Sequence, residues 1–494
     1  QKKNRMYSRI SSILPPAYAS FVFLVAFIGY VVAGQPVFLN PDIPWHIAAG
    51  DLFRANGIIA TNDPWSYSAG HTPWYDVSWL WDILLSWLNE NFGVVALYYL
   101  AAFLLATILA LLCVTLHNRR DIPQFFILLT LMVVWYVQLA FMYAQPVLMS
   151  MLFVVIFHHF LHQSRTAEKR SLLVLPLFML GWVNMHGGFI IGFALIAIYA
   201  LEAWETQQRA WFRRLVWCAA ACAATSLINP NHIFLYDAAY RVMVSPINPY
   251  LIEWKTLTIG DNTSFSVIIL LLFVVTNLRD VRIPLADRIL ALLWLLYALH
   301  AQRAFAVLAL VAAPYLAYSW YTLARHAQPD KVDANVIVIK NGNKEKLLGA
   351  TGIVLALLLC TATPVFSALV PKEKLADDPY GVRAAMAVVE QKIPGARVLN
   401  DFNIGGYLIY NGRGEFPVFL DGRAGTAYPN HVMEEYITLM ALEPGHENII
   451  ARYDINAILT PNFGRLYEAA KASPHWKRIY TTESISAFKY TQHH

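Results

Sequence analysis

The chain has 494 residues, of which 57% are hydrophobic and 14% are charged, and its formal net charge is +5. Soluble proteins carry about 25% charged residues, so this composition excludes an ordinary soluble protein and predicts a polytopic α-helical membrane protein. Most basic residues fall in short loops between apolar segments, where they indicate topology and not a nucleic-acid partner.

The apolar segments predict about eleven membrane spans, each near the length that a bilayer requires. The spans are expected at 17–34, 94–116, 122–139, 143–162, 171–183, 188–203, 211–228, 264–278, 284–299, 302–323 and 347–369. Basic residues before the first span place the N-terminus in the cytoplasm, and Arg119, Arg165 and Arg209 then fall on that side as solvated loop charges. An odd number of spans exports everything after Val370, so residue 335 is predicted to be cytoplasmic and residue 480 exported.

The first outer loop, residues 35–93, is polar and rich in aromatic residues. It contains Asp42, Asp51, Asp63, Asp76 and Asp82, together with six tryptophans. Tryptophans suit the layer between water and lipid. We interpret the loop as one wall of an active site at the outer membrane surface.

Asp42 begins the run DIPWHIAAGDLF, which predicts a helix. Asp is a favoured helix N-cap and Pro44 suits a first turn, so Asp42 is either a cap, a catalytic acid or both. His46 follows one turn later, where it either shares a pocket with Asp42 or serves as a structural histidine. Asp63 precedes a proline, which favours a turn and a structural role.

The run from Asp76 to Phe92 repeats apolar residues at helical spacing and predicts a helix lying in the membrane interface. For Asp76 and Asp82 an anchoring helix without chemistry is the preferred interpretation.

Further polar residues gather at the outer ends of the predicted spans. Such residues are costly at membrane depth and usually face a cavity, so their position favours a site that opens outward. They are Gln145, Asn184, His186, Asn229, Asn231, Glu253 and Arg303. Each residue also has a structural alternative to a role in the site. Asn184 and His186 are also consistent with a tight turn, and Glu253 with a solvated surface position. Arg303 either extends its charged end to the water at the membrane surface or binds a phosphate.

Residues 371–494 change sharply in composition and predict a small α/β domain that folds separately outside the membrane. Helices are expected at 381–391 and 430–442, and strands at ARVLND, YLIYN, INAILTP and ISAFKY. Asp421 and Arg423 are expected to form an internal ion pair. Residues 401–410 combine turn and apolar positions, which suits a lid over an acceptor groove on the outer loops.

Five stretches together carry a family resemblance over nearly the whole chain: PDIPWHIAAG, DPWSY, WVNMHGGF, LINPN with IEW, and NDFNIGGYLIYN with VFLDGRA. The chain resembles the GT-C glycosyltransferases, and more closely a group of bacterial multispan proteins described as GT-C-like. The resemblance implies a GT-C-like transmembrane domain over 1–370 and an exported α/β domain over 371–494. It also implies a bacterial inner-membrane location with the C-terminal domain periplasmic or extracellular.

The GT-C class takes sugars from polyprenyl-phosphate carriers, and Asp42 matches the first-loop acid that serves as base or metal ligand. Glu253 falls where some oligosaccharyltransferases place another acid. NDFNIGGYL is loosely similar to their acceptor-binding WWDYG region, although both tryptophans are missing.

The function expected is transfer of a sugar from a polyprenyl-phosphate carrier to a glycan, lipid or protein acceptor. The expected catalytic residues are Asp42 and His46. The donor phosphate is expected to bind Arg303, His186 and Asn184, and the acceptor is expected to bind Asp401, Asn403 and Tyr407. A divalent metal ion, if the reaction uses one, would bind Asp42 and Glu253. Two alternatives stay open: a scaffold that holds a partner through the exported domain, and a flippase for lipid-linked sugars.

Overall fold

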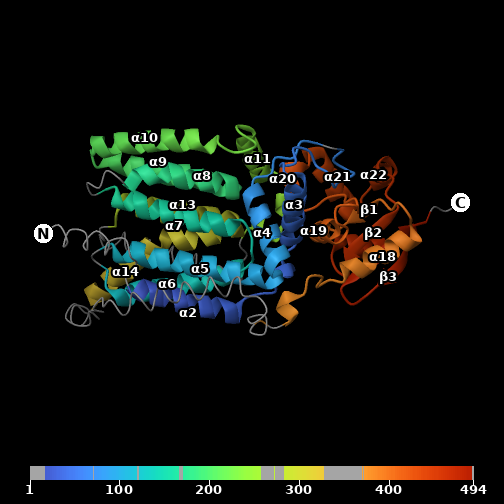
Figure 1. Ribbon diagram of the computed structural model, residues 1–494, viewed down its shortest axis with the longest axis horizontal. Coiled ribbons are helices and arrows are strands. Elements are labelled where there is room, and N and C mark those ends of the chain that lie inside the picture. The colour runs from blue at the N-terminus through green and yellow to red at the C-terminus, as the bar shows by residue number, and fades with distance from the viewer. Residues whose placement is uncertain are drawn as a thin grey trace.

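The computed structural model describes residues 17–70, 72–119, 122–165, 171–256, 272, 283–327, 370 and 372–491. A bundle of long helices fills one part of the molecule and a smaller C-terminal part lies against one end of it (Figure 1). Helices α3 and α4 lie between these two parts.

The bundle helices coincide with the predicted spans wherever the structure describes them. They are α2 (Ala17–Ala33), α5 (Val94–His117), α6 (Gln124–Gln138), α7 (Val147–Gln163), α8 (Leu175–Met185), α9 (Ile190–Glu205), α10 (Arg209–Ser226), α13 (Leu285–His300) and α14 (Phe305–Ala327). Two predicted spans lie outside the described residues: 347–369, and 264–278 apart from residue 272. Short 3-10 turns join or extend the helices: η1 (Val37–Leu39), η2 (Leu139–Phe141), η3 (Ser171–Val174), η4 (Gly187–Phe189), η5 (Asn248–Tyr250), η6 (Ile252–Trp254), η7 (Gln302–Ala304) and η9 (Lys372–Leu375).

Four helical stretches of the described residues are long and apolar enough to cross a membrane: Val94–His117, Gln124–Phe141, Gly187–Glu205 and Gln302–Ala327. Length and composition therefore support a membrane protein, while the total of eleven spans remains a prediction.

The first outer loop folds into two crossed helices, α3 (Asp42–Asn56) and α4 (Trp79–Phe92). Gly57 ends α3 in the left-handed conformation with φ 67°, and its N–H donates to the Phe53 carbonyl at 2.9 Å. Gly50 lies at the crossing, where an added Cβ would clash with the main-chain carbonyl of Asp82. The absence of a side chain at Gly50 therefore allows the two helices to approach closely.

The C-terminal part contains α18 (Val382–Lys392), β1 (Val398–Asn400), α19 (Phe402–Asn411), α20 (Ala424–Ala427), α21 (Asn430–Met440), α22 (His446–Tyr453), β2 (Ala457–Pro461), α23 (Arg465–Ala472), β3 (Trp476–Thr481) and β4 (Ile485–Tyr490). The strands form one sheet in the order β1-β2-β4-β3, with β1 parallel to β2 and the other pairs antiparallel.

The strand predicted at YLIYN is wrong, because these residues belong to α19. Asp401 begins this helix by accepting a hydrogen bond from the Asn403 N–H at 2.9 Å. Such a side-chain cap stabilises a helix start, and tertiary packing on α3 then outweighs the β propensity of the apolar run.

The C-terminal part shares its interior with the first outer loop. Val418 exchanges main-chain hydrogen bonds with Trp65 and Tyr67, each at 3.1 Å. Thr72 donates to the Ala427 carbonyl at 2.7 Å. Residues 62–70 and 72–75 of the loop thus pack as part of the C-terminal core, so the two segments form one folded unit on one end of the bundle.

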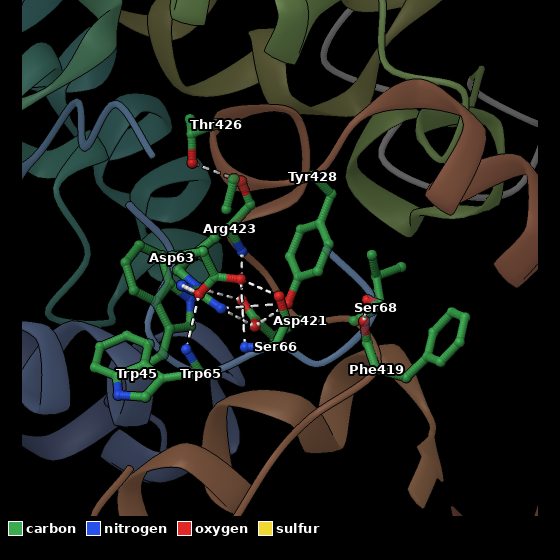
Figure 2. A network of polar contacts seen from close by, with 12 residues as sticks. Trp45, Asp63, Trp65, Ser66, Ser68, Phe419, Asp421, Arg423, Thr426 and Tyr428 are labelled. Atoms are coloured by element: carbon green, nitrogen blue, oxygen red, sulfur yellow. Dashed lines mark hydrogen bonds and ion pairs between the residues drawn. The ribbon is translucent and has the colours of Figure 1, made fainter. Parts of the chain in front are cut away.

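A buried ion network holds this junction together (Figure 2). Arg423 bonds to Asp63 at 2.6 Å and to Asp421 at 2.6 Å, and all three side chains are fully buried. The guanidinium lies 4.8 Å from the Trp65 ring centre and 5.0 Å from that of Trp74. The predicted pair of Asp421 with Arg423 is confirmed, and Asp63 extends it across the junction.

Two of the three arginines predicted as solvated loop charges at the other end of the bundle, Arg119 and Arg165, are paired and largely buried, whereas Arg209 is exposed as predicted. Arg119 bonds to both carboxylate oxygens of Asp287, at 2.5 and 3.1 Å, and His158 lies 3.3 Å from the same carboxylate. Arg165 pairs with Glu202 at 2.7 Å. The prediction was wrong for Arg119 and Arg165 because the loop sequence alone does not reveal the acids that face them, which lie 168 and 37 residues away along the chain.

Candidate active site

Asp42 is the first residue of α3 and is partly exposed at the end of the bundle that carries the C-terminal part. Its side chain does not cap the helix; Oδ1 accepts a hydrogen bond from the Trp45 indole N–H at 3.1 Å. The loop at Gly422 covers this oxygen so closely that a Cβ there would clash with it. Burial raises the pKa of Asp42 to about 6, although the charge of His46 opposes the shift.

His46 lies one turn further along α3 and is buried. Its Nδ1 atom is 2.6 Å from Oδ1 of Asp82 on α4, and the Trp45 ring stacks on it with centres 3.6 Å apart. Burial lowers the pKa of His46 to about 4, although the neighbouring Asp42 opposes the shift. His46 is therefore a neutral, tightly held imidazole at neutral pH.

A second buried acid, Asp76, lies just before α4, and its charge acts on the same site as that of Asp82. Oδ1 of Asp76 accepts from the Ser78 N–H at 2.8 Å and from the Ser78 hydroxyl at 3.0 Å. The Oδ2 atoms of both acids are buried, and no N–H or O–H group in the described part of the chain donates to them. Burial raises the pKa of both acids well above the usual range of an aspartate.

Arg303 supplies a cation at the same end of the bundle. It lies over the Trp254 ring at 4.3 Å and pairs with Glu253 at 3.5 Å, and both charged side chains are partly exposed. The charges of Arg303 and His46 reinforce the effect of burial, which lowers the pKa of His186 to about 3. The charge of Glu253 raises the pKa of Asp42. The fold thus brings Glu253 within electrostatic range of Asp42, and Arg303 within electrostatic range of His186.

The site contains a carboxylate that can accept a proton, Asp42, and a cation that can exchange its partner, Arg303. A partly exposed carboxylate with a pKa near 6 can accept a proton at neutral pH, and a weakly paired arginine can bind an anion. Among the described residues no group of three or more His, Cys, Asp or Glu side chains is arranged to hold a metal ion. Glu253, predicted as a metal ligand with Asp42, is paired with Arg303 instead.

Comparison with solved structures finds similarity over 95% of this chain to ArnT from Cupriavidus metallidurans. The structure bound to undecaprenyl phosphate matches with 13% identity and a TM-score of 0.46, covering 97% of that chain. The apo structure matches with 11% identity and a TM-score of 0.45, again covering 97% of that chain. These neighbours are GT-C glycosyltransferases.

The sequence matches no protein-family model and no curated protein. At a TM-score below 0.5, the neighbours' substrate and site residues are not transferred to this chain. We therefore derive its function from its own side chains.

Two residues predicted to bind the donor phosphate are engaged elsewhere. Asn184 accepts from the Trp79 indole at 3.0 Å and donates to the carbonyls of Leu180 and Ile228, which leaves no amide hydrogen for a phosphate. His186 Nδ1 is 2.5 Å from the Ser150 hydroxyl and accepts from the Gly188 N–H at 3.3 Å. Only Nε2 of His186 therefore remains for a ligand, and Arg303 is the more accessible group.

The residues predicted to bind the acceptor hold α19 in place. Asp401 caps the helix, and the buried Tyr407 hydroxyl donates to the Phe38 carbonyl. Gly406 packs so closely on the Pro41 carbonyl that an added Cβ would clash. Asn403 is exposed and keeps its side chain available. Residues 402–411 form a docked helix beside Asp42 rather than an open lid.

Asp76 and Asp82 are the site residues that the sequence interpretation missed. Their run does form a helix with an apolar face, which is why an anchoring role was preferred. The overlooked signal is the spacing of Ser78, Asp82 and Ser86, which recur every four residues and are all buried. This polar stripe faces α3, where His46 contacts Asp82 and Asp51 contacts Ser86.

Proposed function

We propose that the chain is a glycosyltransferase that moves a sugar from a polyprenyl-phosphate carrier to an acceptor at the outer membrane surface. Asp42 takes the proton of the acceptor hydroxyl as its oxygen bonds to the anomeric carbon of the sugar. The bond between that carbon and the phosphate oxygen breaks, and the phosphate leaves with the bonding electrons. No metal-dependent step is required by this account.

The proposal rests on the pKa and the position of the Asp42 carboxyl. Its pKa of about 6 keeps most of the carboxyl ionised at pH 7, yet it is basic enough to hold a proton during the reaction. The carboxylate lies at the end of the bundle, where a carrier with its tail in lipid presents its sugar. Trp45 and the Gly422 loop fix one oxygen, which orients the other.

Arg303 is the group suited to the departing phosphate. Its pair with Glu253 is long and partly exposed, and such pairs contribute only about 0–1 kcal/mol to stability. A phosphate can therefore replace Glu253 at low cost and gain charge-assisted hydrogen bonds from the guanidinium. Stacking on Trp254 holds the arginine in place during this exchange.

The test replaces Asp42 by Asn, which can still accept the Trp45 hydrogen bond but cannot take up a proton. Transfer from polyprenyl-phosphate sugars should fall about a hundredfold to ten-thousandfold in purified protein of equal thermal stability. Asp51→Asn is the matched control, because Asp51 is an exposed acid on the same helix. Equal turnover of wild type and Asp42→Asn would remove Asp42 as the base. A wild-type protein that transfers no sugar would leave the scaffold interpretation in its place.

A further inference from the structure

Residues 227–252 expose a concentration of large apolar side chains. Nine such side chains are exposed in this segment, for example Phe234 at 55% and Ile252 at 74%. In the whole C-terminal part, over the described residues 372–491, Phe463 is the one large apolar side chain with comparable exposure. Apolar side chains that gather on a surface in this way mark a contact with a membrane or with another protein.

The centre of the 227–252 segment is the short helix α11 (Phe234–Met243), which follows α10 and lies beside α20 (Figure 1). One side of α11 is closed, because Leu235 and Ala238 are buried. Gly425 of α20 lies so close that an added Cβ would come within 2.8 Å of the Arg241 main-chain carbonyl. The C-terminal part therefore packs directly on the helix, and the remaining side of α11 is exposed.

The exposed side of α11 has an apolar edge and a charged edge. Ile233, Tyr240 and Val244 are separated by seven and four residues, which places them along one edge of the helix. Arg241 lies towards the other edge and pairs with Asp237 at 2.7 Å, with both side chains partly exposed. An apolar edge beside an ion pair suits the layer between water and hydrocarbon.

The uncharged part of α10 is too short to cross the hydrocarbon layer of a membrane. The first six residues of this helix contain three arginines: Arg209, Arg213 and Arg214. The remaining residues, 215–226, span about 18 Å at about 1.5 Å per residue, whereas the hydrocarbon layer is about 30 Å thick. Trp217 on this part of α10 is 75% exposed. The apolar side chains of the 227–252 segment thus continue the exposed apolar face of α10 beyond its last residue.

We propose that the 227–252 segment is a lipid contact surface. Its partner is the membrane leaflet on the side of the C-terminal part, with acyl chains against Ile233 and Tyr240 and headgroups at the Asp237–Arg241 pair. Continuity with the exposed face of α10 favours lipid over a second protein chain as the occupant. Because α11 packs between this leaflet and α20, the contact also holds the C-terminal part at the membrane surface.

The first experiment locates the lipid on the wild-type full-length chain. The protein is reconstituted in phosphatidylcholine vesicles in which some acyl chains carry a diazirine near the ester end and others near the methyl end. After illumination, mass spectrometry identifies the peptides that carry lipid. Adducts are expected in residues 227–252 and at Trp217, but not at Phe463, which is 68% exposed. A water-soluble diazirine should give the reverse order of labelling.

The second experiment changes the apolar edge of α11. Ile233→Asp combined with Tyr240→Asp should lower the yield of lipid adducts in residues 227–252 severalfold, because carboxylates are costly in contact with hydrocarbon. Phe463→Asp is the matched control at a comparably exposed side chain and should leave that yield unchanged. Unchanged adducts at Trp217 show that each variant is inserted as in wild type.

Wild-type adducts at Trp217 without adducts in residues 227–252 would overturn the lipid contact, and so would an unchanged yield in the double variant. Photo-induced links between two protein chains through this segment, in place of lipid adducts, would assign the surface to a second copy of the chain.

Discussion

At the scale of single residues, environment and not residue type separates the roles of the loop acids. Asp63 is fully buried but receives an arginine, so it is a structural anion. Asp76 and Asp82 are equally buried, pair with no lysine or arginine among the described residues, and have pKa values that burial raises well above the usual range. Asp42 alone is partly exposed with a pKa that lies close to neutrality.

The pH dependence of transfer should follow Asp42. A base works only when it is ionised, so the rate should fall as the pH falls through about 6, the folded-state pKa of Asp42, and should level off above it. The acid limb of kcat/KM between pH 4.5 and 8 measures this in wild type. The residual activity of Asp42→Asn should lack that limb; if the same limb persists there, another group provides the proton acceptor.

At the scale of elements, the site depends on how closely α3 and α4 cross. The His46–Asp82 bond spans the two helices, and so does the hydrogen bond from Ser86 to Asp51 at 2.6 Å. Gly50 lies between these two contacts along α3 and permits the approach. Close packing of α3 against α4 therefore sets the geometry of the candidate catalytic groups.

Gly50→Ala should separate α3 from α4, because the new Cβ meets main-chain atoms of Asp82 that cannot rotate away. We expect a loss of about 1–3 kcal/mol in the free energy of unfolding together with lower turnover. Thermal unfolding and transfer assays measure the two effects.

Gly181→Ala is the control for that substitution. Its Cβ would meet the edge of the Phe153 ring at 3.2 Å, and a ring can shift by a few tenths of an ångström. Helix propensity favours alanine there by up to about 1 kcal/mol. If Gly50→Ala and Gly181→Ala lower the free energy of unfolding equally, the close crossing of α3 and α4 is not the cause of the loss at Gly50.

At the scale of the whole molecule, charged clusters lie at both ends of the helix bundle. Arg119 with Asp287 is buried at the end remote from the C-terminal part, and Arg423 with Asp63 and Asp421 is buried at the junction with it. The second cluster ties the C-terminal part to the first outer loop and so keeps the Gly422 loop over Asp42.

Arg423→Ala should loosen that junction, because it leaves two buried carboxylates without a cation. Breaking a buried pair in this way costs about 3–5 kcal/mol. Limited proteolysis should then cut within residues 57–78, and the unfolding temperature should fall. Arg383→Ala removes an exposed pair with Asp377 and should change stability by less than about 1 kcal/mol. A protease-resistant Arg423→Ala protein would show that other contacts hold the junction.

The sequence by itself determined the features that depend on local pattern. Apolar length located the bundle helices that the structure describes, and acids beside prolines and tryptophans identified the outer loop and Asp42. The pair of Asp421 with Arg423 was also foreseeable, because its members are two residues apart.

Only the tertiary structure decided which distant residues meet. Asp82 lies 36 residues from His46, and Asp63 lies 360 residues from Arg423. Burial raises the pKa of Asp76 and Asp82, whereas Asp63 is paired with Arg423, although all three acids belong to one loop. The YLIYN run became a helix for the same reason, because its packing against α3 outweighed its local preference. Desolvation and long-range pairing act through the folded neighbourhood, and a single sequence does not contain that neighbourhood explicitly.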